Sequence, residues 1–298
     1  MTYAPIVVFG FNRPDALRNT IASLLKNKEA KYSDLYVFVD GPRKEKVGEV
    51  LKVEEVRDFV ENITGFKSLH YFFSEVNKGL ANSIIEGVGQ VVCQYGKVIV
   101  LEDDLVLMPN FLNFMNQGLD YYENKQQVMS VCGHSCKVTP PKDYPYDAYF
   151  FTRSSSWGWG TWKDRWLTVD WELNDWNAVV SNKKKFIKSE GSDVFKMLND
   201  WKHRRNNSWA IRFCYAQFVQ KKLSVFPTKS LVDNEGFAGD GTNCKTYSRF
   251  KFELNDSKTT GQFRLPTEVK LLKGFQKQIL WYHSIPLRIW SRVMYFIK

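Results

Sequence analysis

The sequence predicts an α/β fold with a mostly parallel central sheet flanked by helices, in a single main domain that ends in a basic, amphipathic C-terminal tail. Short runs of β-branched and aromatic residues alternate with amphipathic helix patterns in the first third of the chain, which is typical of βαβ units. The chain has 298 residues, of which 44% are hydrophobic and 25% charged, so it can bury a sizeable core. No internal repeat or low-complexity linker separates a second domain.

The alternation is clearest before residue 103. The first strand, PIVVFGF, precedes a helix pattern in which Pro14 falls near the first turn, while Leu17, Ile21 and Leu24 share one face. The further strands are expected at 35–41, 68–74 and 97–102, and the further helices at 46–63 and 78–94.

After residue 111 the pattern changes. The expected elements are helices at 109–122 and 206–222, strands at 128–133 and 148–151, and a strand with a glycine-rich loop at 223–244. A tryptophan-dense segment, SSSWGWGTWKDRW, lies at 154–166. We therefore expect one domain over 1–260 and a helical, membrane-associating tail over 261–298.

The tail carries most of the net charge. Seven basic residues and one acidic residue lie between Gly261 and Lys298, so +6 of the formal +10 is found there, together with many aromatic residues. This mixture predicts a helix that lies in a membrane interface and is attracted to anionic lipid. The alternative is that the apolar residues of the tail pack back on the main domain.

Several classes of protein are disfavoured. A strand-like run follows Met1 directly, so no signal peptide is expected, and no apolar run is long enough to span a bilayer. The five scattered cysteines fit a reducing compartment, and the CGHSC run at 132–136 lacks a second pair of zinc ligands, so buried thiols are expected there. Outside the tail the chain is mildly basic and has no nucleic-acid recognition motif, so no nucleic-acid partner is expected.

Polar residues follow four of the expected strands. They are Asn12 and Arg13, then Asp40, then Asn77 and Lys78, and finally the acidic triplet Glu102, Asp103 and Asp104. Because ligands bind beyond the carboxyl ends of parallel strands, these clusters should converge on one edge of the sheet. Carboxylates at such an edge suit Mg²⁺ or Mn²⁺, which can in turn hold a diphosphate, and basic residues at the neighbouring strand ends suit the same phosphates.

Other nucleotide-binding designs fit less well. A P-loop needs a glycine-rich loop that ends in Gly-Lys-Ser or Gly-Lys-Thr, and the sequence has none. A dinucleotide-binding fold needs Gly-x-Gly-x-x-Gly after the first strand, where this chain has GFNRPD. The glycine-rich activating loop of a sugar nucleotidyltransferase is also missing from the start of the chain.

Four segments together resemble a GT-A-fold glycosyltransferase: PIVVFGFNRPDALRNTIASLL, LYVFVDG, VIVLEDDLVLMPNFLNFM and FFTRSSSWGWGTWKDRW. The resemblance covers about residues 4 to 245. It points to the branch of N-acetylglucosaminyltransferase I (glycosyltransferase family 13) and its bacterial polysaccharide-assembly relatives. It implies a metal, Mn²⁺ or Mg²⁺, held by Asp104. It also implies a donor site and a pocket for acceptor or sugar at Trp157, Gly158, Trp159 and Gly160. The implied donor-binding residues are Phe11, Asn12, Arg13, Asp40, Lys78, Asn82, Glu102 and Asp103.

The sequence departs from this family at one position. The family's general base is an aspartate on the helix after the tryptophan segment, and Ala210 stands there. An acceptor hydroxyl still needs a group that takes its proton, for which Asp240 is the first candidate, followed by Asp233 and Glu235. An ordinary turn residue is the alternative for Asp240, and retention of configuration stays open.

The function implied is the metal-dependent transfer of a sugar from a nucleotide-diphosphate donor, with a UDP-sugar expected, to a glycan or lipid-linked saccharide in bacterial surface polysaccharide assembly. The expected location is the cytoplasmic face of the inner membrane, with peripheral contact through the tail. A sugar-nucleotide nucleotidyltransferase and an inactive sugar-binding protein are the alternatives.

Overall fold

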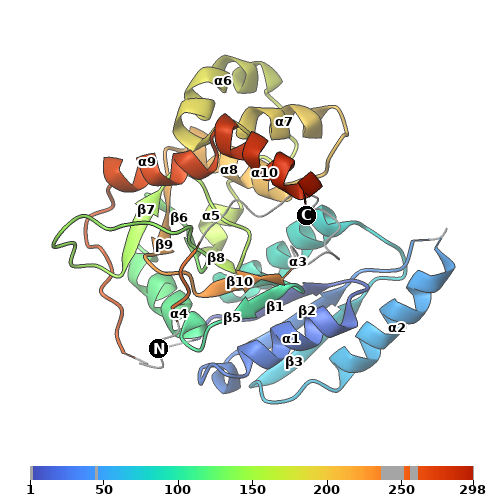
Figure 1. The fold of residues 1–298 in the computed structure, drawn as a ribbon. Coiled ribbons are helices and arrows are strands. Elements are labelled where there is room, and N and C mark those ends of the chain that lie inside the picture. The colour runs from blue at the N-terminus through green and yellow to red at the C-terminus, as the bar shows by residue number, and fades with distance from the viewer. Residues whose placement is uncertain (1–2, 44–45, 236–251, 256–260, 298) are drawn as a thin grey trace.

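The computed structural model describes residues 3–43, 46–235, 252–255 and 261–297, and it shows a mixed α/β fold (Figure 1). Its main sheet has eight strands in the order β3-β2-β1-β4-β8-β6-β9-β7. The strands are β1 Ile6–Gly10, β2 Asp34–Val39, β3 Ser68–Phe73, β4 Lys97–Glu102, β6 Val128–Cys132, β7 Ala148–Phe151, β8 Trp159–Trp162 and β9 Leu223–Pro227. Strands β7 and β8 run against their neighbours and the other six share one direction, so the prediction of a mostly parallel sheet is confirmed.

The first half follows the predicted alternation. Helices α1 (Pro14–Leu24) and α2 (Val47–Glu61) cover one face of the sheet, and α3 (Leu80–Tyr95) covers the other (Figure 1). Strand β1 is buried along its whole length, because Ile6 and Val8 pack toward α1 while Val7 and Phe9 pack toward α3. Such a strand carries apolar residues on both faces, which explains the unbroken VVFGF run.

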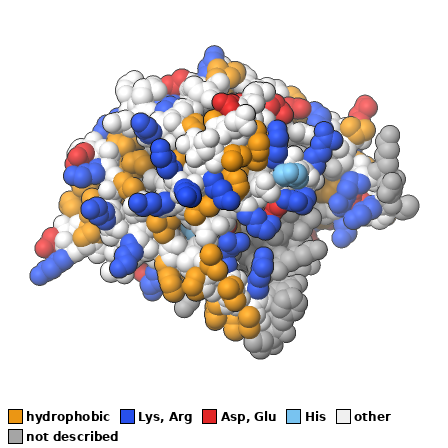
Figure 2. Space-filling view, turned by 90° about the horizontal axis from the view of Figure 1, so that it is seen from above, with side chains coloured by type: hydrophobic (Ala, Val, Ile, Leu, Met, Phe, Trp, Pro, Cys, Tyr) orange, Lys and Arg blue, Asp and Glu red, His pale blue; other side chains and the backbone are white. Residues whose placement is uncertain are grey.

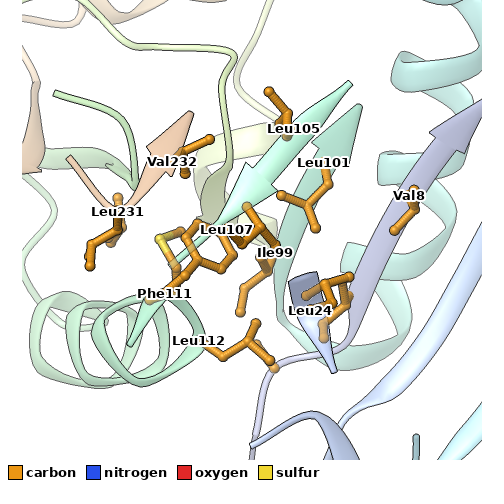
Figure 3. Packing of buried hydrophobic residues seen from close by; sticks show 14 of the residues in the cluster. Val8, Leu24, Ile99, Leu101, Leu105, Leu107, Phe111, Leu112, Leu231 and Val232 are labelled. Carbon is orange, nitrogen blue, oxygen red and sulfur yellow. The ribbon is translucent and has the colours of Figure 1, made fainter. Parts of the chain in front are cut away.

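A second, two-stranded sheet holds the segment after β4 in place. Strand β5 (Leu105–Leu107) pairs with β10 (Val232–Asn234) in the antiparallel sense. Figure 3 shows Leu105, Leu107 and Val232 packed with residues of β4 and with Phe111, the first residue of α4 (Phe111–Tyr122). The apolar LVL run after the acidic triplet thus anchors the triplet's turn to the core.

The second half contains helices that the sequence pattern did not predict. Helices α5 (Lys163–Trp166), α6 (Trp176–Glu190) and α7 (Val194–Lys202) precede α8 (Trp209–Val219), which was expected. Helix α6 carries a run of exposed lysines at 183–185 and buries only Val179, Phe186 and Glu190, so the sequence shows little of the helical period.

The tail divides into two helices with different surroundings. Helix α9 (Lys273–Tyr282) packs on the main domain, since Phe275 is fully buried and stacks on Tyr149 with ring centroids 4.5 Å apart. Helix α10 (Ile285–Ile297) instead exposes more than half of the Ile285 and Ile289 side chains. The interpretation in which the tail packs back on the main domain thus describes α9, and membrane contact stays a prediction. Among the described residues, no helix combines the length and apolar character needed to cross a bilayer.

Candidate functional site

The acidic triplet ends strand β4 at the carboxyl edge of the sheet. Glu102 is the last residue of the strand, and Asp103 and Asp104 form the turn that leads into β5. Arg13, which immediately precedes α1, donates to Asp104 Oδ2 at 3.1 Å and forms an ion pair with Asp103. The structure thus brings the predicted Arg13 and the triplet together, with the guanidinium lying on the carboxylates.

One guanidinium faces three carboxylates in this cluster. Burial raises the pKa of Glu102 to about 8, and the neighbouring charges of Asp104 and Asp103 raise it further. Burial also raises the pKa of Asp103 to about 6, although Arg13 opposes this shift. The cluster therefore holds more potential negative charge than its protein partners neutralise.

The donor set of the cluster fits a hard divalent cation. Its ligands are carboxylate oxygens, which Mg²⁺ and Mn²⁺ prefer. Among the residues that the structure describes, no group of three or more His, Cys, Asp or Glu side chains forms a cage for a metal ion. A cation at Asp104 would therefore take most of its ligands from phosphate and water, as Mg²⁺ does in nucleotide sites.

Asp40 lies at the end of β2 and organises the loop that leads into α3. Its carboxylate accepts hydrogen bonds from the backbone N–H groups of Gly41 at 3.0 Å, and of Lys78 and Gly79 at 2.8 Å each. The Lys78 side chain points to Glu86 on α3 at 2.8 Å, and Asn82 donates to the Lys78 carbonyl at 2.8 Å. The structure places Lys78 at the expected edge, with its charge paired on the helix.

A second cluster at this edge was not predicted from the sequence. Glu49, buried at the start of α2, accepts from the backbone of Arg43 at 2.9 Å, forms an ion pair with its guanidinium, and accepts from Asn12 at 3.0 Å. The Arg43 guanidinium lies 5.4 Å from the centre of the Phe11 ring. Hydrogen bonds from Arg43 hold the pKa of Glu49 at about 2. No local motif marks this cluster, because its residues follow two strands and begin a helix.

Two of the three candidates for the general base lie beside the triplet. The backbone N–H of Glu235 donates to the Asp104 carbonyl at 3.0 Å, and Asp233 pairs with Val106 across the small sheet. The Glu235 carboxylate accepts from Asn19 on α1 at 3.3 Å. Asp240 lies outside the described residues.

The tryptophan segment begins at the edge of the sheet and continues into its buried part. Trp159 pairs with Val100 of β4, so Trp157, two residues earlier, leaves the sheet on the side where β4 ends in Glu102. Gly158 has φ of +65°, and its carbonyl accepts from Gly133 at 2.7 Å. A side chain there would meet Phe111 at 2.9 Å, so the turn requires glycine on both counts.

The expectation that Trp159 and Gly160 line a pocket for acceptor or sugar needs correction. Trp159 is 1% exposed and stacks on Trp209 and Trp166, and Gly160 lies against the Val98 carbonyl within the sheet. Strand β8 runs between β4 and β6, Leu119 and Met115 of α4 lie against Gly160, and rings of α8 lie against Trp159, so neither residue is open to a ligand. Trp157 is the tryptophan of this segment that lines a cavity.

That cavity has a volume of about 270 Å³ and lies under helices α8 and α9. Trp157, Ala210 and His134 line it, and the Trp157 and His134 rings lie 4.3 Å apart. Arg153 and His283 also line it, the latter from the junction of α9 and α10. Its residues come from separate segments, so no sequence pattern singled it out.

The comparisons with known proteins agree with this geometry. The model of glycosyl transferase family 2 matches residues 6–169, which is more than half of the chain. The match contains the triplet, Arg13, Asp40 and the tryptophan segment, and it ends before α6. No curated protein matches the chain.

Distant likenesses to solved structures accompany the family match. A mannosyltransferase from Pyrobaculum calidifontis, solved with GDP-Man and Mn²⁺, is 12% identical over 55% of this chain and 46% of its own, with a TM-score of 0.37. The S. aureus protein TarS is 12% identical over 49% of this chain and 24% of its own, with a TM-score of 0.31. Mouse xyloside xylosyltransferase 1 is 10% identical over 75% and 83% of the two chains, with a TM-score of 0.39. The chain spans less than half the length of the first two proteins.

Proposed function

The chain belongs to glycosyl transferase family 2 and has the GT-A type of α/β fold, and from this premise we propose that it moves a sugar from a nucleotide-diphosphate donor, with a UDP-sugar expected, to a saccharide acceptor. The observation that carries the proposal is the meeting of Arg13 with the acidic triplet at the carboxyl edge of the sheet. This edge lies inside the family match, and the polar ends of β1, β2 and β4 all reach it.

In the proposed reaction, an acceptor hydroxyl attacks the anomeric carbon and a nucleoside diphosphate departs. A divalent cation at Asp104, with Glu102 and Asp103 beside it, would supply positive charge for the departing diphosphate. Arg13 holds the Asp103 and Asp104 carboxylates in place and adds a second positive charge at the same position. Asp40 fixes the Lys78–Gly79 turn, so backbone and side chains there shape the donor site.

On the nucleotide side, we propose that Phe11 provides a flat surface for the base and that Asn12 and Asn82 border it. Glu49 orients Arg43 against Phe11, which restricts the motion of both side chains. A guanidinium over an aromatic ring forms an extended planar surface suited to a nucleobase.

The acceptor's proton needs a base, and Ala210 cannot serve. We propose an inverting reaction with Asp240 as the base, and with Asp233 and Glu235 as the next candidates. The proximity of β10 to the triplet supports the choice of this part of the chain, because residues 233–235 lie at the reacting edge. The assignment to the N-acetylglucosaminyltransferase I branch and to a hexosyl or N-acetylhexosaminyl donor is part of the same proposal.

We further propose that the enzyme works on the inner face of a bacterial membrane in surface polysaccharide assembly. Helix α10 exposes Ile285, Ile289 and Val293, with Arg288 and Arg292 on the same helix. Figure 2 shows basic side chains interspersed with hydrophobic ones on the face that also carries α6 and α7. Such a face can attract anionic lipid and insert apolar side chains between headgroups.

The experiment is a product assay with purified full-length protein, Mn²⁺ and a panel of nucleotide sugars and saccharides. The proposal expects release of a nucleoside diphosphate that depends on the acceptor. Release of pyrophosphate would identify the nucleotidyltransferase alternative. If every donor stays intact with and without acceptors, the chain is an inactive sugar-binding protein and the proposal fails.

A further inference from the structure

The cavity under α8 and α9 is distinct from the donor edge. Of the predicted donor-binding and metal-binding residues, none lines it. Its lining residue Trp157 lies two residues before Trp159, which pairs with Val100 of β4, so one wall of the cavity adjoins the end of β4 at Glu102. A donor held by its diphosphate at Asp104 leaves this space to the second substrate.

The walls of the cavity are mainly aromatic and aliphatic. Tyr149 and Phe151 on β7 and Phe226 on β9 form its floor, while Ile211 on α8 and Ile279 on α9 close the sides. Flat apolar surfaces of this kind stack on the C–H faces of pyranose rings and accommodate methyl groups.

The polar groups at the cavity are hydroxyls, imidazoles and one ion pair. The ion pair joins Arg153 to both carboxylate oxygens of Asp193, at 3.0 and 3.2 Å, and the same guanidinium lies 3.2 Å from His283 Nδ1. The charge of Arg153 is thus matched within the protein. A phosphate or carboxylate placed here would gain no unmatched cation and would lose its hydration, so the lining favours a neutral guest.

The C-terminal segment completes this cavity. Phe275 fixes α9 against Tyr149, and Ser192 donates to the His283 carbonyl at 2.6 Å, so Ile279 and His283 stay on the cavity wall. The helix that follows, α10, is the one with the exposed apolar and basic face. The cavity is therefore walled in part by α9 and by its junction with α10, the proposed lipid-facing helix.

We infer that this cavity is the acceptor subsite and that it binds the terminal ring of a neutral saccharide bearing a small apolar group, such as an N-acetyl or 6-deoxy methyl group. This inference rests on the proposed function, because the bound saccharide is an acceptor only if the protein transfers sugars. The volume of about 270 Å³ is close to the lower end of the roughly 300–1,000 Å³ of ligand pockets, so it holds about one ring. Trp157 covers the ring at the reacting end, and α9 encloses its apolar substituent.

The test measures saccharide binding by saturation-transfer NMR on the full-length protein. The probes are methyl N-acetyl-β-glucosaminide, methyl α-rhamnoside and, as a charged counterpart, methyl β-glucuronide. Met197→Trp on α7 fills the cavity from one wall, and Ala210→Leu fills it from another. Asn199→Trp, on the same helix as Met197 and outside the lining, is the matched control. UDP and GDP binding with Mn²⁺ is recorded on the same samples.

The inference expects at least one neutral glycoside to bind, the glucuronide to bind at least about tenfold more weakly, and both filling variants to weaken the neutral probe about tenfold or more while Asn199→Trp does not. It is overturned if no neutral glycoside binds, if the glucuronide binds equally well, or if binding survives in both filled variants. Nucleotide binding should be the same in all samples. If neither UDP nor GDP binds to the wild-type protein, that result counts against the proposed function. The saccharide results still decide whether the cavity binds a neutral glycoside.

Discussion

The proposed donor edge and the proposed acceptor cavity are built in opposite ways. The donor edge consists mainly of charged residues within five positions of a strand end, on strands that lie next to one another in the parallel half of the sheet. The cavity is mainly apolar and is assembled from segments between residues 134 and 283. The family match ends at residue 169, so it contains the whole first region and about half of the residues that line the second. The part that would hold the nucleotide is thus local, and the part that would select an acceptor is dispersed.

The largest expected effect is a difference in the free energy of unfolding between variants of two tryptophans in the segment 154–166. Trp159→Ala removes a fully buried ring that stacks on Trp166 and Trp209, so the free energy of unfolding should fall by about 3–5 kcal/mol. Trp157→Ala removes a partly exposed ring at the cavity and should cost much less stability while weakening the saccharide acceptor. Urea denaturation and acceptor kinetics measure the two effects. Equal destabilisation by both variants would contradict the division into edge and core.

This contrast also shows how far the sequence was informative. The strand ends with Arg13, Asp40 and Asp104 were predictable, because parallel strands bring their carboxyl ends to one edge whatever the later chain does. The burial of Trp159 was not predictable, because it depends on the insertion of β8 between β4 and β6. Strands β4 and β8 lie about sixty residues apart in the sequence. The Gly-Trp pattern alone does not distinguish a ring in the core from a ring at an edge.

The same limit applies to the tail and the cavity. The composition of 261–298 was consistent with membrane contact or with docking on the main domain. Only the structure shows that α9 docks, because Phe275 and Ile279 have a complementary apolar surface on β7 and β9, whereas Ile289 on α10 stays exposed. Arg43 and Glu49, and likewise Arg153, Asp193 and His283, meet through tertiary packing. No spacing rule connects such residues.

A second prediction addresses the donor edge directly. Asp104→Asn keeps the shape of the side chain and removes its charge, so the transfer rate should fall by about 100- to 1,000-fold because the departing diphosphate loses its cation site. The folded state should persist, since Arg13 still pairs with Asp103. A sugar-transfer assay and far-UV circular dichroism provide the measurements. Asp15→Asn, an exposed acid on α1, is the control and should retain full activity.

A third prediction uses a buried acid near the cavity. Glu190 is fully buried, and burial raises the pKa of its carboxyl to about 7 despite a hydrogen bond from Ser189. The folded protein therefore holds this proton at pH values where the unfolded chain has released it. The free energy of unfolding should fall by up to about 3 kcal/mol as the pH rises from 4.5 to above 7.

Glu190→Gln should remove the share of the fall that Glu190 contributes, so the variant gains stability over the wild type at pH 8 and little at pH 5. The raised pKa values of Glu102 and Asp103 add their own shares to the fall in both proteins. Denaturant titrations at the two pH values make the measurement. Glu54→Gln, on an exposed position of α2, should leave the pH dependence unchanged. A wild-type stability that does not decrease between pH 5 and pH 8 would show that Glu190 is ionised without cost.

The smallest expected effect concerns α10, the helix that we propose faces lipid. Arg292→Gln removes one exposed charge from α10 and should weaken binding to vesicles containing phosphatidylglycerol about fivefold, equivalent to about 1 kcal/mol. Vesicle sedimentation measures the change. Lys26→Gln, just after α1 at the far end of the molecule from α10, should have no effect (Figure 1). Equal losses in the two variants would indicate a general charge effect and no specific lipid-facing helix.

The central claim is that the acidic triplet holds a cation that in turn holds a nucleoside diphosphate. Calorimetric titration of UDP and GDP into the wild-type protein and Asp104→Asn, each with Mn²⁺ and with EDTA, tests it most directly. The account predicts that Mn²⁺ strengthens binding of at least one nucleotide about tenfold or more in the wild type and has little effect in Asp104→Asn. Nucleotide binding that is as strong in EDTA as in Mn²⁺, or an equal effect of Mn²⁺ in both proteins, would contradict it.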